Sequence, residues 1–321
     1  DRAEEEIRSR VPQVRQPPRM RLTFPVEPQD EFDADPELAL LADWADTVVR
    51  LPIDEESRAF VGEELKDFPL EFLLFARHIK TITLRWDGGE RKISAKEKDG
   101  VITLSDGQNR TRWRVFEASE ELSAEAKVDV PTGYDPDRPV PMLWAVPVKG
   151  ESNGRVWTFF PTDVEISLSG ILNAPWKTTE DRTSVSSGPY NNELLEVASR
   201  LVADSLPILV DDVDQPGDIV DILPEEDAFR RHGWLEKTLA ESVYEECSRS
   251  EAFCDSNGDR CLAEDLKLSG LEPHPKTGEL WAEAPTVPPG WAHWTFFTES
   301  RRARMEELGA WLPFRGNWLE S

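Results

Sequence analysis

A polar loop at residues 177–189 carries the residue types with which proteins recognise anions. Lys177, Asp181 and Arg182 lie in it, between a predicted strand and a predicted helix. An arginine offers a planar fork of donors that matches a phosphate, and a lysine offers a compact positive charge. In the simpler interpretation both cations are solvated loop residues. The pattern therefore predicts a candidate anion-binding loop and leaves the simpler interpretation open.

Other acidic residues do not form a recognisable catalytic or metal site. Asp163 and Glu165 fall on one face of a predicted strand, but such pairs are common in a chain with 63 acidic residues. The loop that begins at Asp255 resembles a calcium loop, yet its sixth position is Arg260 and its twelfth is Leu266. Calcium loops need Gly and Glu there, so we interpret this loop as a hairpin turn or a strand-helix turn. The sequence also has no Gly-x-Ser-x-Gly motif.

Cysteine and histidine are sparse. The three cysteines are at positions 247, 254 and 261, and the four histidines are at 78, 232, 274 and 293. A structural zinc site usually shows close ligand pairs, and the spacing of seven between these cysteines provides none. The sequence therefore predicts free, buried or half-buried thiols, no metal site, and a reducing compartment.

The elements around the loop predict a sheet covered by a helix. Alternating apolar residues indicate strands at 139–148, 156–160 and 166–172, and Pro175 should end the last of these. A helix is expected over 191–206, because its apolar residues recur at helical spacing. The loop would then pass from the sheet to its covering helix.

Upstream, the sequence predicts two helices and a meander. The helices are expected at 54–68 and 69–79, and the strands at 80–86, 92–96, 101–105 and 111–116. Three Asp-Gly pairs at 87, 99 and 106 mark the hairpin turns between them. Before these come a helix at 1–11, strands at 20–24 and 46–52, and a helix capped at Asp33 or Asp35.

Downstream, a linker at 207–224 should lead to a helix that begins near residue 225. The Trp-rich stretch 288–297 contains no Lys or Arg, so we expect its aromatic residues to be buried in a core rather than to form a surface on which bases stack. The last expected helix covers 299–311.

The run from Phe159 to Val202 resembles the segment that follows the ATP-binding domain in sacsin-like members of the GHKL ATPase superfamily. The resemblance rests on Phe160-Pro161-Thr162, Asn173-Ala174-Pro175-Trp176, Asp181-Arg182 and Ser184. The position of Asn173 is usually His in that family. The superfamily also holds the ninety-kilodalton heat-shock chaperone, in which a middle-domain arginine reaches the γ-phosphate of ATP. The resemblance therefore implies that role for Arg182, with Lys177 as the substitute.

The resemblance also implies a domain organisation and a fold class. Residues 1–53 would be the C-terminal part of a GHKL ATP-binding domain, 54–208 a middle-like domain, and 209–321 a smaller α/β region of unknown role. The expected class is α+β, with mixed sheets, covering helices and a β-α-β core that resembles a ribosomal protein fold. The sequence has no Gly-x-Gly-x-x-Gly or phosphate-loop motif. We therefore expect a fragment that begins inside the ATP-binding domain, so that ATP and Mg²⁺ would bind only the longer protein.

Charge and composition limit the partners. The 321 residues carry a net charge of −26, which argues against nucleic acid and against anionic membranes. No apolar run approaches the ~20 residues that cross a bilayer. The expected setting is cytoplasmic, with the chain's own upstream ATP-binding domain and client proteins as partners, and a homodimer is left open. Two functions remain: the middle region of a chaperone-like GHKL ATPase, and a non-catalytic scaffold that keeps the fold without ATP chemistry.

Overall fold

The computed structural model describes residues 28–49, 51, 53–149, 154–181, 183–225, 228, 233–269 and 290–312. The chain falls into two compact units, Asp1–Val61 and Gly62–Ser321. The predicted α+β class is confirmed at this level, because a large mixed sheet is combined with several helices. No helix among the described residues has both the length and the apolar character needed to cross a membrane.

The first unit contains two short helices, α2 (Pro28–Ala34) and α3 (Pro36–Ala42). The carboxylate of Asp35 accepts hydrogen bonds from the backbone N–H groups of Glu37 and Leu38, at 3.1 and 3.2 Å. This N-cap satisfies donors that the first turn leaves unpaired, as predicted for Asp35.

The strand predicted at 46–52 is wrong for the positions that the structure describes, 46–49 and 51, which are not in a strand. A strand is stable only beside a partner, and the described part of this unit holds no second strand. The helix predicted at 1–11 and the strand predicted at 20–24 lie outside the described residues.

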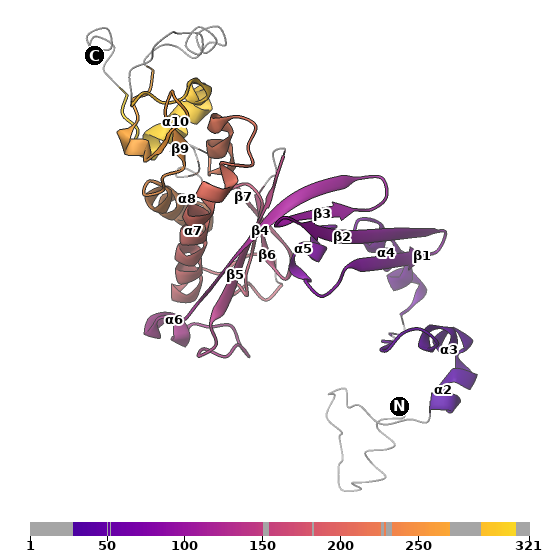
Figure 1. The fold of residues 1–321 in the computed structure, drawn as a ribbon. Coiled ribbons are helices and arrows are strands. Elements are labelled where there is room, and N and C mark those ends of the chain that lie inside the picture. Colours follow the sequence, from indigo (N-terminus) through magenta and orange to yellow (C-terminus); the bar gives the residue numbers. More distant parts are fainter. Residues whose placement is uncertain are drawn as a thin grey trace. The chain divides into compact units, whose positions relative to one another are not determined.

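The second unit is built on an eight-stranded sheet in the order β1-β2-β3-β4-β5-β8-β6-β7 (Figure 1). Neighbouring strands are antiparallel, except that β6 and β8 are parallel. The strands are β1 (Thr81–Trp86), β2 (Gly89–Lys98), β3 (Val101–Ser105), β4 (Arg110–Glu120), β5 (Val140–Pro147), β6 (Gly154–Thr158), β7 (Phe160–Ile166) and β8 (Ile171–Asn173).

The predicted meander is confirmed as β1 to β4. Between β2 and β3, Asp99 and Gly100 both have positive φ, 54° and 72°. A two-residue hairpin turn of this kind matches the twist of the flanking strands and requires residues that tolerate the left-handed region. Asp-Gly is such a pair, which is why this part of the sheet could be read from the sequence.

The strands that follow differ from the prediction. In place of strands at 156–160 and 166–172, the chain turns at Phe159 and then runs along β7 before the short β8. Phe159 has a φ of 65°, and its N–H donates to the side chain of Asn173 at 2.8 Å. Pro161 lies in β7, the outermost described strand, where a missing N–H is tolerated. As predicted, β8 ends before Pro175.

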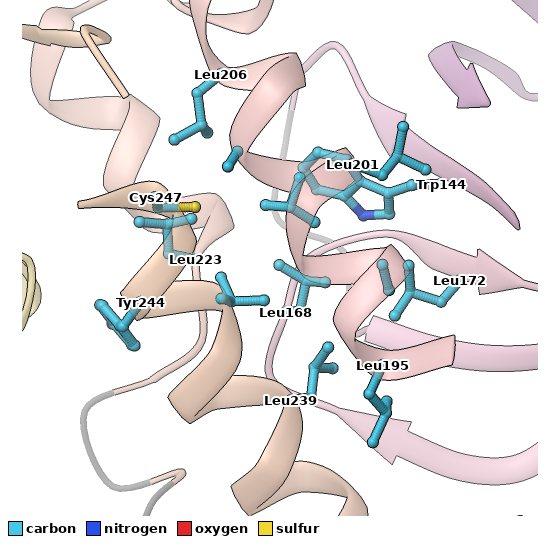
Figure 2. Close-up of a cluster of buried hydrophobic side chains, with 14 of the residues drawn as sticks. Trp144, Leu168, Leu172, Leu195, Leu201, Leu206, Leu223, Leu239, Tyr244 and Cys247 are labelled. Atoms are coloured by element: carbon cyan, nitrogen blue, oxygen red, sulfur yellow. The ribbon is translucent and has the colours of Figure 1, made fainter. Parts of the chain in front are cut away.

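One face of the sheet packs on α7 (Pro189–Leu209), and α8 (Trp234–Cys247) packs on α7 in turn. Figure 2 shows how side chains from the sheet, from α7 and from α8 converge in this core. Among its largest wholly buried members are Trp144 and Leu172 from the strands and Leu194 from the helix. Burial of each such side chain contributes about 1.5–3 kcal/mol.

Helix α7 continues through Pro207, beyond its predicted end at 206. A proline inside a helix has no N–H to donate to the carbonyl four residues earlier, which here belongs to Ala203. The hydroxyl of Ser250 donates to that carbonyl at 3.3 Å. The missing backbone bond is thus replaced from a distant part of the chain, which the local sequence could not reveal.

The opposite face carries a second, smaller core beneath α5 (Phe72–Phe75). The helix predicted over 69–79 is correct only for these four residues. Ala76 leaves the helical region (φ −88°, ψ 63°), so that the chain can turn into β1. The preceding helix, α4 (Glu55–Lys66), confirms the helix predicted at 54–68.

The C-terminal part is a set of short elements closed by α10 (Glu299–Glu307), which ends earlier than predicted. The turn that begins at Asp255 is confirmed, because it joins β9 (Phe253–Cys254) to β10 (Arg260–Cys261). The buried Trp291 and Phe296 confirm that the described part of 288–297 belongs to a core. The remaining elements are α6 (Ala124–Val128), η1 (Pro216–Ile222), η3 (Ala263–Asp265) and η4 (Trp294–Phe296).

A single hydrophobic core joins residues from Leu122 to Ala310. The expected boundary between residues 208 and 209 falls inside this core, at the end of α7. The three functional domains remain a prediction. Residues of the last two, 54–208 and 209–321, share this one hydrophobic core.

Candidate functional site

The predicted anion-binding loop is a small hairpin between β8 and α7, which we call the 177–186 hairpin. Thr178 and Val185 pair as an antiparallel bridge, and Thr179 N–H donates to the Ser184 carbonyl at 2.9 Å. Near the tip, the carboxylate of Asp181 accepts from the Thr179 hydroxyl at 2.5 Å and from Thr183 N–H at 3.1 Å. These bonds hold the pKa of Asp181 below its usual range, the Thr179 hydroxyl contributing most.

Arg182, the predicted catalytic residue, lies outside the described residues. Both of its neighbours are placed: Asp181 by the bonds just described, and Thr183 by a bond from the edge of the sheet. Asp163 N–H, in β7, donates to the Thr183 carbonyl at 3.1 Å. Hydrogen bonds therefore fix both sequence neighbours of Arg182, which are Asp181 and Thr183.

The two ends of the hairpin, Lys177 and Ser186, which we call its feet, are held by one buried side chain. This is Asn191, in the first turn of α7. Its amide nitrogen donates to the carbonyls of Lys177 and Ser186, at 2.7 and 2.6 Å, and its amide oxygen accepts from Lys177 N–H at 3.0 Å. Only 1% of Asn191 is exposed. Sequence analysis gave it no role, although its place on the apolar stripe of α7, beside Leu194 and Leu195, is a signal for a buried polar group.

Lys177, the predicted substitute cation, is engaged in holding the hairpin. Its ammonium donates to the carboxylate of Asp129 and to the Asp129 carbonyl, the latter at 3.0 Å. The second carboxylate oxygen of Asp129 accepts from Tyr190 N–H, at the N-terminus of α7. The Lys177 ammonium contributes most to holding the pKa of Asp129 below its usual range. An acid at this end of a helix also complements the helix dipole.

The residues that carry the family resemblance support the hairpin and the edge of the sheet. Thr162 donates its hydroxyl proton to the Val156 carbonyl at 2.6 Å, and the buried Tyr190 hydroxyl donates to the Pro175 carbonyl at 2.9 Å. The amide oxygen of Asn173 accepts from Phe159 N–H.

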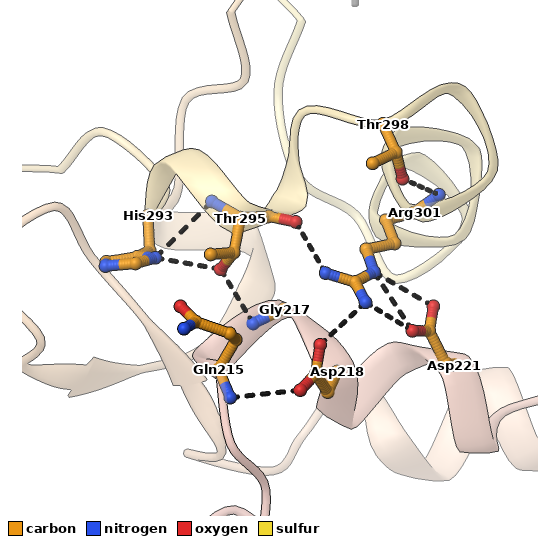
Figure 3. A network of polar contacts seen from close by, with 8 residues as sticks. All are labelled: Gln215, Gly217, Asp218, Asp221, His293, Thr295, Thr298 and Arg301. Carbon is orange, nitrogen blue, oxygen red and sulfur yellow. Dashed lines mark hydrogen bonds and ion pairs between the residues drawn. The ribbon is translucent and has the colours of Figure 1, made fainter. Parts of the chain in front are cut away.

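A second polar cluster, not predicted from the sequence, joins η1 to η4 and α10 (Figure 3). Arg301 pairs with Asp218 and Asp221 at 2.7 and 2.5 Å and donates to the Thr295 carbonyl at 3.0 Å. The Thr295 hydroxyl lies 2.8 Å from His293 Nδ1, which is the spacing of a nucleophile and its base. It also accepts from Gly217 N–H at 2.8 Å, and Thr295 is buried. We therefore assign this cluster to fastening the C-terminal elements.

The cysteines and acids form no metal centre in the described part of the chain, where no group of three or more His, Cys, Asp or Glu residues could hold an ion. The three cysteines are free, and two of them are buried. Burial raises the pKa of all three thiols, that of Cys261 to about 11. Such thiols are poor nucleophiles at neutral pH.

Comparison with protein-family models, with curated proteins and with solved structures returns no match. The functional argument therefore rests on the geometry of the 177–186 hairpin and on the residues that hold it.

Proposed function

We propose that this chain is the middle region of a chaperone-like GHKL ATPase, in which the 177–186 hairpin presents Arg182 to the γ-phosphate of ATP. The nucleotide and its Mg²⁺ would be held by an ATP-binding domain upstream in the same protein. The observation that carries the proposal is the anchoring of the hairpin. Asn191 and Lys177 fix its feet, and Asp163 fixes the chain next to its tip.

Anchoring matters because positioning and charge provide most of the catalysis of phosphoryl transfer. A cation that is fixed before the reaction stabilises the charge that develops on the transferring group without a further cost of ordering it. A loop held at both feet and beside its tip supports this role better than a freely moving one. The guanidinium of Arg182 would bind the γ-phosphate oxygens in the transition state.

We assign the catalytic role to Arg182 and a positioning role to Lys177. The ammonium of Lys177 is already neutralised by Asp129. Releasing it would leave the Asp129 carboxylate half-buried without its partner, which is unfavourable. Asp181 and Thr183, the sequence neighbours of Arg182, are bonded to each other and do not take part in this ion pair.

The test is ATP turnover and ATP affinity in a protein long enough to include the upstream domain. Arg182→Ala should lower turnover about 10³-fold and leave ATP affinity nearly unchanged. Arg138→Ala is the matched control, because Arg138 is an exposed arginine in another loop. Equal loss of turnover and affinity in Arg182→Ala, or loss of neither, would refute the assignment. If neither protein binds ATP, the scaffold function replaces it.

A further inference from the structure

Positive charge without a partner gathers on one side of the meander, in a chain that is strongly acidic. Residues 80–116 contain nine Lys or Arg residues and five Asp or Glu residues, so their net charge is +4, whereas that of the whole chain is −26. The buried Ile93, Leu104 and Trp113 face the smaller core. Because successive side chains of a strand point to opposite faces, the residues between them point to the other side of the sheet.

The strand register arranges the side chains of that other side in two rows across β2, β3 and β4. The first row is Lys96, Thr103 and Arg112, and the second row is Ser94, Ser105 and Arg110. Lys92 precedes the second row on β2. We call these seven residues the cationic face. Helix α7 packs on β4 and β5 on the same side of the sheet, and the meander extends beyond it (Figure 1).

The four cations of this face are exposed. None of them forms an ion pair with a residue that the structure describes. Their neighbours on the same side are paired, Arg85 with Glu90 and Arg114 with Asp212. The cationic face is therefore the part of this side whose charge is available to a ligand.

The usual structural reasons for charge on a sheet do not fit these cations. Lysine on an edge strand prevents pairing with other chains, but β2 and β4 have partner strands on both sides. A chain with a net charge of −26 needs no further charge for solubility. The hydroxyls of Thr103 and Ser105, on β3, separate the cations of β2 from those of β4, so that no like charges are directly opposite. This arrangement provides several hydrogen-bond donors side by side for an anion.

The size of the face favours a short acidic ligand over a long polyanion. Its two rows are two residues apart along the strands, which is about 6.6 Å. Carboxylates border it, with Glu90 two residues before Lys92 on β2 and Asp99 at the β2–β3 turn. A nucleic acid or a membrane surface extends past the rows and would meet these carboxylates within a Debye length, about 8 Å at physiological salt. The seven residues also include no aromatic side chain on which a base could stack.

We propose that the cationic face binds a short acidic segment of a partner protein, held in an extended conformation with Asp or Glu at alternate positions. In an extended peptide, alternate side chains share one face and are also about 6.6 Å apart, so successive carboxylates would meet successive rows. Lys96 and Arg112 would bind one carboxylate and Arg110 the next, while the hydroxyls of Thr103 and Ser105 donate to them. Arginine clusters are a common means of recognising acidic motifs. This binding requires no ATP.

The test measures the affinity of the full chain for an acetylated eight-residue peptide of alternating glutamate and threonine, by fluorescence anisotropy. A peptide with glutamine in place of glutamate is the uncharged control. The double variant Lys96→Thr, Arg112→Thr removes both cations of the first row, and threonine favours a strand, so folding should be retained. The matched control is the double variant Arg138→Gln, Lys237→Gln, which removes the same charge from exposed positions outside the meander.

We expect the wild type to bind the glutamate peptide and to show shifted backbone amide resonances in residues 94–96, 103–105 and 110–112. The double variant of the first row should bind roughly fivefold to thirtyfold more weakly, because two exposed ion pairs are lost. The control variant should bind within about twofold of the wild type, because distant exposed charges are screened. Raising NaCl from about 50 to about 200 mM should weaken wild-type binding.

The inference is overturned if the wild type binds the glutamine peptide as tightly as the glutamate peptide, or if it binds neither. Equal affinity of the two double variants would also overturn it, because binding would then not depend on the cationic face. Two further probes test other anionic ligands: an eight-nucleotide oligothymidylate, and vesicles of phosphatidylserine and phosphatidylcholine. Tighter binding of either probe than of the peptide, weakened by Lys96→Thr with Arg112→Thr, would overturn the inference and assign the face to nucleic acid or to a membrane.

Discussion

Replacing Asn191 by Leu should detach the 177–186 hairpin from α7. Leucine has the same branched shape and the same number of side-chain heavy atoms, so the change removes three hydrogen bonds and keeps the shape of the side chain. The Lys177 carbonyl keeps the bond from Ser186 N–H. The Lys177 N–H and the Ser186 carbonyl lose the partner that Asn191 provides.

The expected cost follows from these two unpaired groups. A buried backbone group left without a partner costs about 1–3 kcal/mol, so the total is about 3 kcal/mol for a site that is only partly buried. Asn192→Ala is the control, since Asn192 is the exposed neighbour in the same turn. Its effect should stay within about 0.5 kcal/mol.

Amide hydrogen exchange is the most direct assay, because the hairpin can open without unfolding the core. The N–H groups of Thr179 and Ser184, both bonded within the hairpin, report its opening. A loss of 3 kcal/mol corresponds to roughly hundredfold faster exchange. Urea unfolding followed by tryptophan fluorescence gives the global stability alongside. If the two amides exchange at the wild-type rate and the urea midpoint is unchanged, Asn191 does not hold the hairpin and the reasoning fails.

Three further predictions concern charge. The pKa of Asp129 is held below that of an unfolded chain, so its contribution to stability is complete above a pH of about 3.9 and is lost as the pH falls through the folded value. Lys177→Met should flatten this acid limb in urea titrations at several pH values. Burial lowers the pKa of His293, so the unfolded chain binds the proton more readily and stability should decline as the pH falls below about 6.5. His293→Gln should remove that decline. Arg301→Met breaks two ion pairs and should cost about 2–3 kcal/mol in urea unfolding, whereas Arg249→Met, which breaks two solvent-exposed ion pairs with Glu245 and Glu246, should cost far less. Equal losses in the two arginine variants would contradict the assignment of the C-terminal cluster.

The meander was predictable because its turns depend on local chemistry. Asp99 and Gly100 can adopt the left-handed conformation that a tight hairpin requires, and the apolar alternation on either side of them sets the strands. The long helix α7 was likewise evident from its apolar stripe. In both cases the residues that decide the structure are neighbours in the sequence.

The errors come from contacts between distant parts of the chain. Phe159 has no local reason to turn the chain, and its conformation depends on Asn173, fourteen residues later. Pro207 should end a helix, but Ser250 replaces the bond that it removes. The sequence pointed to the loop that contains Arg182, whereas the role of Asn191 emerges only when the hairpin and the helix are placed together.

The core shared by α7 and the C-terminal elements has a consequence for synthesis on the ribosome. The side of α7 that packs on α8 has no cover until α8, which ends at Cys247, has been made. At ~5–20 residues per second, the 38 residues from 210 to 247 take roughly 2–8 s to add. During that interval the nascent chain exposes the apolar face of a long helix. It reaches the native state only if aggregation is slower than synthesis or if a ribosome-associated chaperone covers this face.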